Sequence, residues 1–396
     1  MRFNLWEDCN RVPLTELLSF IVDNRGKTVP TAPSGHKLIA TNCVTNNTLF
    51  PMYDKIRYLS EETYQTWFRA HPIPGDILFV NKGTPGRVCL VPDPVDFCIA
   101  QDMIALRADE SKIYPKYLFT VLRSREIQQQ IYNTNVGDVI PHFKKQFLDQ
   151  LLIPIPERSI QESIGDLYYV LSLKAERNKK INDNLQQQAF SVFDNLIANA
   201  ENNDYTVSAY AFLNPKRTLA KNQVARSIDM SQLSTSGAFP SGWEMKPFNG
   251  GMRFTNGDTL LARITPCLEN GKTAFIDFLD DGEVAFGSTE YIVLAPKNDT
   301  PPEMLYCLAR YPAFVDYAVK NMNGSSGRQR VSAETVGQYR LPLFDKHSLV
   351  LFKEVVSPMF LKMRYNSLEN MRLAELRDAL LPKLMSGEID VSAVQL

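Results

Sequence analysis

The sequence has little of the chemistry that marks a secreted protein, a metalloprotein or a membrane protein. Its 396 residues include only six cysteines, none of them in a CxxC pair, so neither a zinc site nor a disulfide framework is indicated. The four histidines show no metal-binding spacing. No stretch approaches about 20 uncharged apolar residues, and the first residues contain no apolar run of signal-peptide length. We therefore expect a cytoplasmic protein with reduced thiols and no membrane association.

Signatures of catalysis are also missing. The sequence has no GxxxxGK[S/T] loop for nucleotide phosphates, no glycine-rich cofactor loop and no Asn/Asp-Pro-Pro-aromatic motif of a methyltransferase. For a nuclease site of the Asp and Glu-x-Lys type, the sequence offers only Glu244-Met245-Lys246, and no partner acid lies at suitable spacing. We therefore expect no catalytic residues, no cofactor and no metal in this chain.

An excess of positive charge is absent as well. Lys and Arg number 43 against 44 Asp and Glu, which gives a formal net charge of -1. Domains that are held on nucleic acid by bulk charge are usually clearly basic. Any contact with nucleic acid must therefore use local basic clusters or charge that partners supply. The hydrophobic fraction of 44% is normal for packed cores, and the length leaves room for two or three domains.

What the sequence does contain is one pattern written twice. Matching phrases occur in the same order in both halves: GDIL at 75–78 with GDTL at 257–260, PKYL at 115–118 with PEML at 302–305, NTNVG at 133–137 with NMNG at 321–324, and LLIPIP at 151–156 with YRLPL at 339–343. Arg123 and Arg310 follow the second phrase at the same offset. The chain is therefore expected to be two copies of one structural unit.

Each copy reads as a mixed segment that leads into a long helix. Short apolar runs separated by Pro, Gly and Asn predict strands, and one short helix interrupts them, over 115–132 in the first copy and 302–319 in the second. Longer segments with helical apolar spacing follow, over 157–200 and from about 347 to 381. Pro358 should kink the second long helix or mark a late start.

These segments predict an α+β fold. Two long helices, each with one apolar stripe, would bury those stripes against each other, and the simplest pairing is an antiparallel coiled coil. We predict two pseudo-twofold-related globular domains joined by these helices. The expected boundaries are 1–156 for the first globular domain, 157–200 for the first helix, 201–343 for the second globular domain, and 344–396 for the second helix and tail.

Four phrases carry a resemblance to a known family. They are GDILFVNKGTPGRVCLV at 75–91, LLIPIPERSIQESIGDLYYVL at 151–171, DTLLARITPCLENGKTAF at 258–275 and LRDALLPKLMSGEIDV at 376–391. Over essentially its whole length the chain resembles the specificity subunit of type I restriction-modification enzymes. The resemblance implies two target recognition domains that read a bipartite site in double-stranded DNA, one half-site each. It also implies assembly with methyltransferase (modification) subunits and restriction/translocase subunits, which carry the catalysis.

Base and phosphate contacts need Arg, Lys, Asn, Gln or hydroxyl side chains on loops. Four loop-like clusters supply them, around NKGTPGR, NTNVGDVIPHFKK, RITPCLENGK and NGSSGRQR. The candidate DNA-binding residues are Lys82, Thr84, Arg87, Asn133, Asn135, His142, Lys144, Lys145, Arg263, Lys272, Asn323, Ser325, Arg328, Gln329 and Arg330. For any single residue, a solvated loop beside the sheet is the simpler interpretation.

Two other functions stay open on the sequence. The chain could be the specificity module of a related or fused restriction-methylation system, which the subunits that co-purify with it would reveal. It could also be a two-headed scaffold that binds proteins and not DNA. Salt-dependent binding to duplex DNA separates the scaffold from the DNA readers.

Overall fold

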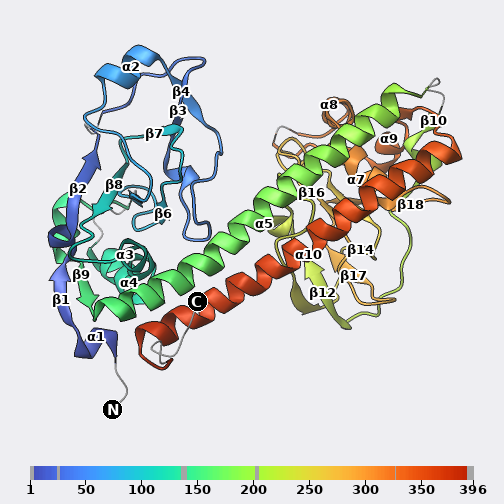
Figure 1. Ribbon diagram of the computed structural model, residues 1–396. Helices are drawn as coiled ribbons and strands as arrows, with labels where there is room; N and C mark the ends of the chain where they lie inside the picture. Colours follow the sequence, from blue (N-terminus) through green and yellow to red (C-terminus); the bar gives the residue numbers. More distant parts are fainter. Residues whose placement is uncertain (1–3, 25–26, 135–140, 201–204, 326, 390–396) are drawn as a thin grey trace. The chain divides into compact units, whose positions relative to one another are not determined.

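The computed structural model describes residues 4–24, 27–134, 141–200, 205–325 and 327–389, and the chain forms two compact units (Figure 1). Unit 1 consists of Met1–Glu176 and Arg372–Leu396, and unit 2 of Arg177–Met371. Helix α5, Arg158–Ala198, begins in unit 1 and ends in unit 2. Helix α10, Lys346–Met385, begins in unit 2 and ends in unit 1. None of the helices in these described ranges is long and apolar enough to cross a membrane.

Over its described residues, unit 1 forms three small sheets. The strand orders are β2-β8-β5-β6, with all neighbours antiparallel, β4-β3-β7, with β3 and β7 parallel, and β1-β9. The elements before α5 are α1 (Leu5–Asp8), β1 (Asn10–Pro13), η1 (Leu14–Leu17), β2 (Leu18–Asp23), β3 (His36–Ile39), η2 (Thr41–Cys43), β4 (Arg57–Leu59), α2 (Glu61–Thr66), β5 (Ile77–Val80), β6 (Val88–Leu90), β7 (Phe97–Ile99), β8 (Met103–Ala108), α3 (Pro115–Leu122), α4 (Arg125–Thr134), η3 (Lys145–Gln150) and β9 (Leu152–Ile155).

Unit 2 has corresponding sheets. The strand orders are β11-β18-β15-β16, β13-β12-β17-β14, with β12 and β17 parallel, and β10-β19. The elements between α5 and α10 are β10 (Tyr205–Thr206), α6 (Val207–Tyr210), β11 (Ala211–Leu213), β12 (Val224–Ile228), η4 (Met230–Gln232), β13 (Glu244–Pro247), β14 (Met252–Phe254), β15 (Thr259–Ala262), β16 (Thr273–Phe275), β17 (Ala285–Gly287), β18 (Tyr291–Pro296), α7 (Pro302–Arg310), α8 (Pro312–Lys320), α9 (Ala333–Gly337) and β19 (Arg340–Leu341).

The two units share one topology. The order β2-β8-β5-β6 in unit 1 corresponds to β11-β18-β15-β16 in unit 2, and each second sheet contains one parallel pair inside an otherwise antiparallel arrangement. The GD phrases make the same turn in both, because Gly75 and Gly257 each have φ of 87°, a conformation that glycine adopts without strain. The fully buried strands β5 and β15 follow these turns.

The aspartates of the same phrases accept equivalent bonds. Asp76 accepts from the Ile73 backbone N–H and from Arg107, and Asp258 accepts from the Thr255 backbone N–H and from Arg217. Both carboxylates are buried. The GD phrase is therefore a scaffold element in both units.

The short helices differ from the sequence prediction. Each predicted single helix is two helices, α3 and α4 in unit 1 and α7 and α8 in unit 2. In unit 2 the break is set by Pro312, which lacks an N–H and holds Tyr311 in an extended conformation. In unit 1 the hydroxyl of Ser124 accepts from the Ile127 backbone N–H, in the manner of a helix N-cap.

An arginine after the first of these helices holds a neighbouring loop in each unit. The buried Arg123 donates to the carbonyl oxygens of Thr45, Thr48 and Val88. The equivalent Arg310 donates to the carbonyls of three residues of one loop, which are Ser234, Thr235 and Gly237. The repeated arginine noticed in the sequence is therefore part of the scaffold, because its donors satisfy backbone groups that would otherwise lack partners.

Each unit packs its core against part of both long helices. In unit 1, Ile164 and Tyr168 of α5 lie in the same core as Leu381 and Leu384 of α10. In unit 2, Ala189 and Phe193 of α5 lie in the same core as Phe352, Val356 and Phe360 of α10. Burial of such side chains is worth about 1.5–3 kcal/mol each.

Hydrogen bonds between α5 and α10 show the relative direction of the two helices. Within unit 2, the Asn178 amide donates to Asn370, 3.0 Å away, and the Asn182 amide donates to the Met363 carbonyl, 3.1 Å away. Residue numbers that rise along α5 therefore meet falling numbers along α10, which makes the pair antiparallel. The predicted fold class, a mixed fold with two globular parts and two long helices, is confirmed. The domain boundaries given above stay a prediction.

Helix α10 corrects one detail of the sequence analysis. It is continuous from Lys346 to Met385, so a late start at Pro358 is wrong, and the helix continues past Pro382 and does not end at Leu381. A proline inside a helix removes one backbone bond and costs about 3 kcal/mol. The buried Val356 and Phe360, which flank Pro358, offset that cost by packing into the core of unit 2.

Candidate nucleic-acid interface

Two loops of unit 1 lie side by side at the end of the buried strand β5. The Phe143 N–H donates to the Asn81 carbonyl at 2.8 Å, the Gly83 N–H donates to the Pro141 carbonyl at 2.9 Å, and Lys82 and His142 form an isolated antiparallel bridge. We call residues 81–87 and 141–145 loop pair 1. Two of the donor-rich clusters that the sequence analysis identified are thus adjacent in space.

Unit 2 repeats this connection at the end of β15. The Val331 N–H donates to the Arg263 carbonyl at 3.0 Å, the Thr265 N–H donates to the Gln329 carbonyl at 3.0 Å, and Ile264 and Arg330 form an isolated antiparallel bridge. We call residues 263–272, 323–325 and 327–330 loop pair 2. The backbone pattern matches that of unit 1 bond for bond, so the two loop pairs are equivalent structures.

A third bond fixes an acidic residue beside each loop pair. The Asn81 N–H donates to the Asp102 carbonyl at 2.9 Å, and the Arg263 N–H donates to the Glu290 carbonyl at 3.0 Å. Asp102 and Glu290 therefore occupy the same backbone position. Sequence reasoning missed both, although each lies immediately before an apolar strand, β8 or β18, and this repeated position was the signal that could have revealed them.

The predicted residues of unit 1 fall into two groups. Lys82 and Lys144 are exposed, Thr84, Arg87 and His142 are half-buried, and within the described ranges the side chains of these five have no hydrogen-bond or ion-pair partner. Their donors are available to a ligand.

The remaining candidates of unit 1 are engaged or lie elsewhere. The Lys145 ammonium pairs with Asp23 at 2.8 Å. Asn133 lies on helix α4, where its side chain accepts from Gln129, so its placement in a loop is wrong. Asn135 lies outside the described residues.

In unit 2, one carboxylate holds two predicted arginines. The Glu290 carboxylate accepts from Arg330 Nε at 3.0 and 2.9 Å, from Arg330 Nη2 at 2.8 Å and from Arg263 Nε at 3.2 Å. The bonds from Arg330, followed by those from Arg263, lower the pKa of the Glu290 carboxyl. Both arginines are predicted from the sequence, but their meeting on one carboxylate is not.

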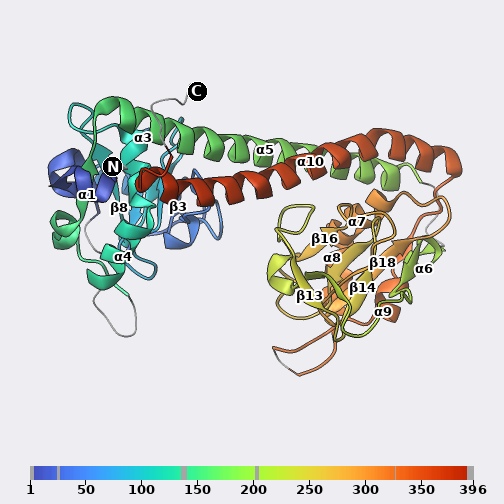
Figure 2. The same cartoon turned by 90° about the horizontal axis from the view of Figure 1, so that it is seen from below.

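The described residues of the second loop in loop pair 2, 323–325 and 327–330, extend beyond the strands of unit 2 (Figure 2). Asn323 and Arg330 close it by a pair of backbone bonds, each 2.9 Å long. Asn323, Ser325 and Arg328 are exposed, and Gln329 is half-buried. The guanidinium of Arg328 has no partner within the described ranges. This loop therefore presents an unpaired cation and several polar groups to solvent.

Lys272, the last predicted residue of loop pair 2, is engaged inside the unit. Its ammonium donates to the Met230 carbonyl at 2.7 Å, and the residue is half-buried. It ties the end of its loop to the segment after β12. In the described part of the chain, no three His, Cys, Asp or Glu side chains gather in a way that could hold a metal ion.

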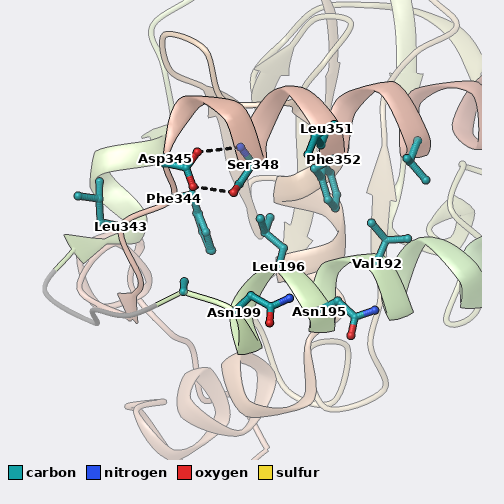
Figure 3. A pocket seen from close by; sticks show the side chains of 12 residues that line it. Val192, Asn195, Leu196, Asn199, Leu343, Phe344, Asp345, Ser348, Leu351 and Phe352 are labelled. Atoms are coloured by element: carbon teal, nitrogen blue, oxygen red, sulfur yellow. Dashed lines mark hydrogen bonds between the residues drawn. The ribbon is translucent and has the colours of Figure 1, made fainter.

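A second surface lies between α5 and α10 inside unit 2. Apolar side chains from both helices, with Val192 and Leu196 on one and Leu351, Phe352 and Val355 on the other, line a groove of about 630 Å³ (Figure 3). Leu351 and Val355 are 47% and 46% exposed. The Asp345 carboxylate accepts from the backbone N–H and the hydroxyl of Ser348, so Asp345 caps the start of α10. The groove is therefore an apolar face on a well-anchored helix end.

Comparison with known proteins places residues 17–187 in the family described as type I restriction modification DNA specificity domain. The chain is 22% identical to the type I restriction enzyme HindI specificity subunit of Haemophilus influenzae, over 80% of this chain and 86% of that protein. It is 33% identical to the EcoAI specificity subunit of Escherichia coli, over 32% of this chain and 22% of that protein.

A solved structure shares the fold. The S subunit of a type I restriction-modification system from M. genitalium superimposes with a TM-score of 0.57 and 16% sequence identity, and the match covers 96% of both chains. The likeness therefore extends over both units and both long helices of the described chain.

Proposed function

We propose that this chain is a type I restriction-modification specificity subunit and that it reads a bipartite site in double-stranded DNA, with one loop pair for each half-site. The observation that carries the proposal is the repeated backbone connection between the two donor-rich loops of each unit. A shared scaffold that presents unlike side chains is what recognition of two different half-sites requires. The predicted domain boundaries follow the same division into two readers and two helices.

Charge supports a local mode of binding. The formal net charge of -1 supplies no general attraction to DNA, whereas Lys82, Lys144 and Arg328 are exposed cations without partners in the described ranges. Such side chains bind phosphates and orient the protein, while base edges are read by planar donors and acceptors. Loop pairs 1 and 2 offer both kinds of group.

In this role the chain is a non-catalytic DNA-recognition subunit that acts in the cytoplasm. Methyltransferase subunits and restriction/translocase subunits supply the chemistry. We place the docking site for a methyltransferase helix in the apolar groove of unit 2, because its exposed leucine and valine side chains match the apolar face of an amphipathic helix.

The test of DNA recognition uses the full chain in complex with its methyltransferase subunits. Selection from a randomised duplex library should recover two fixed sequence blocks separated by a constant, non-specific spacer. Binding should weaken steeply with salt, because Lys and Arg contacts release counterions from the phosphates. Recovery of no sequence, together with binding that salt does not change, would favour the protein scaffold and contradict the proposal.

The test of docking uses Leu351→Glu, which places a charge in the apolar groove. The methyltransferase subunits should no longer co-elute with the variant, while unit 2 keeps its melting temperature. Lys353→Glu, an exposed substitution on the same helix, is the matched control and should leave co-elution intact. Retention of the subunits by the Leu351→Glu variant would move the docking site elsewhere.

A further inference from the structure

Arg330 is the most constrained of the candidate DNA-binding side chains. Its Nε and Nη2 donate to the Glu290 carboxylate, and its Nη1 donates to the Arg328 carbonyl at 2.9 Å. Three bonds in the plane of a guanidinium fix both its position and its rotation. A side chain that is already ordered loses little conformational entropy when a ligand binds.

The bonds that remain define what this side chain can recognise. A guanidinium has five N–H groups, of which Arg330 uses one on Nε, one on Nη1 and one on Nη2. One N–H is left on each terminal nitrogen. The side chain is 37% exposed, so solvent reaches it. Guanine is the base that offers two adjacent acceptors, O6 and N7, in the major groove.

We propose that Arg330, held by Glu290, reads a guanine in the half-site that unit 2 binds. The inference rests on the proposed DNA-reading function and adds the residue and the base. Glu290 is a positioning residue in this account, because it accepts from the arginine and leaves the terminal donors toward the DNA. A carboxylate so close to DNA would repel phosphates unless it were neutralised, and Arg330 and Arg263 provide that neutralisation.

Arg263 is the alternative reader on the same carboxylate. It reaches Glu290 through one bond from Nε, 3.2 Å long, so its guanidinium is free to turn about that contact. It also lies directly after β15, at the root of its loop, whereas Arg330 lies at the base of the extended loop that carries Arg328. The geometry therefore favours Arg330.

Unit 1 lacks the corresponding group. His142 occupies the backbone position of Arg330, Asp102 that of Glu290 and Asn81 that of Arg263. The Asn81 amide donates to the Phe143 carbonyl at 3.3 Å, which is a contact inside the scaffold. The guanine contact is therefore expected in one half-site only.

The experiment compares the sequences selected from a random duplex library by the complete methyltransferase complex with wild-type chain or variants. Arg330→Ala should lose the preference at one position, which is a guanine in the wild-type consensus, and should keep every other position. Glu290→Gln should weaken the preference at that same position. Arg340→Ala, which removes an exposed arginine outside both loop pairs, is the matched control and should retain it, and Arg263→Ala tests the alternative reader.

A base analogue gives a second readout on the wild-type site. Replacing that guanine by 7-deazaguanine removes the N7 acceptor, and it should weaken wild-type binding by about tenfold and Arg330→Ala binding by less than about twofold. A purely structural role for Arg330 would instead weaken binding to both duplexes equally.

The outcomes separate the two proposals. If the wild-type complex selects no sequence, DNA recognition itself fails. If it selects a bipartite site and Arg330→Ala leaves the consensus unchanged, only the present inference is overturned. Loss of the guanine in Arg263→Ala but not in Arg330→Ala would assign the contact to the other arginine and also overturn it.

Discussion

Loop pairs 1 and 2 have the same backbone bonds and different side chains. In loop pair 2, Glu290 gathers two arginines, whereas the equivalent positions of unit 1 hold Asp102, Asn81 and His142. The comparison shows that different parts of the repeat have different roles. The parts that match, such as the GD turns and the arginine after the first short helix, bind backbone groups, and the parts that differ include exposed cations such as Lys82 and Arg328.

The largest expected effect concerns the shared scaffold arginine. Arg123→Ala should destabilise unit 1 by about 3–5 kcal/mol, because it leaves the buried Val88 carbonyl and the half-buried Thr48 carbonyl without donors. Arg310→Ala should destabilise unit 2 by about 1–2 kcal/mol, since Arg310 is only half-buried. Denaturant unfolding of the full chain measures both values.

The control for that pair is Arg125→Ala. Arg125 is an exposed arginine two residues further along, and its removal should change the unfolding free energy by no more than about 0.5 kcal/mol. Equal losses for Arg123→Ala and Arg125→Ala would contradict a scaffold role for the buried residue.

A pH effect is expected in unit 2. Burial raises the pKa of Asp258 to about 6, against the lowering effects of the Thr255 backbone bond and of Arg217, from an ordinary value of 3.8. A raised carboxyl pKa means that the folded unit binds the proton more tightly than the unfolded chain. Protonation of Asp258 therefore contributes on the order of 3 kcal/mol to the unfolding free energy. This contribution is fully present below pH 4 and is lost as the pH rises to about 6.

The Asp258→Asn variant tests this sign. The unfolding free energy of wild-type unit 2, minus that of the variant, should fall as the pH rises from 4 to about 6 and stay constant above that. A difference that grows over the same range would mean that the charged form is the one the fold stabilises.

Transfer of the side chains tests whether the scaffolds are interchangeable. The double substitution His142→Arg and Asp102→Glu places the arginine and carboxylate of loop pair 2 on the backbone of loop pair 1. The half-site of unit 1 should gain a guanine preference of about tenfold, while the other half-site is unchanged. Library selection with the methyltransferase complex measures it, and an unchanged first half-site would show that the loop pairs differ in more than side chains.

The smallest expected effect comes from a phosphate contact. Arg328→Ala should weaken binding several-fold for every duplex sequence and reduce the slope of log affinity against log salt by about 1. Arg340→Ala removes the same charge from an exposed position outside both loop pairs and should leave the slope unaltered. A change of consensus in the Arg328→Ala variant would make Arg328 a base reader.

Much of the scaffold could be predicted from the sequence. Helical spacing over 157–200 anticipates α5, Arg158–Ala198, and the GD and PKYL phrases mark turns and helix starts that the structure contains in both units. These signals are local, since they depend on spacing, on proline and on glycine. The break after Arg123 was missed because its cause is a serine cap, and serine side chains bond the backbone in turns as well as at helix starts.

The site itself was predictable only as a set of loops. Arg263 and Arg330 are far apart in the sequence, and their meeting on Glu290 depends on the order of β15 and β18 in one sheet. Lys145 and Lys272 are lysines in donor-rich loop sequences, as Lys82 is, yet their ammonium groups are engaged within their own units. A basic residue in a loop therefore indicates a candidate, and tertiary contacts decide whether its charge is available.

The most direct test of the modular account is the double substitution Arg328→Ala and Arg330→Ala. Affinities of the complete complex are measured for the selected duplex and for two duplexes in which one half-site or the other is scrambled. Wild-type affinity should fall for either scrambled duplex, whereas the variant should lose part of its sensitivity to scrambling of one half-site and keep its full sensitivity to the other. Equal loss of sensitivity to both half-sites would contradict the account.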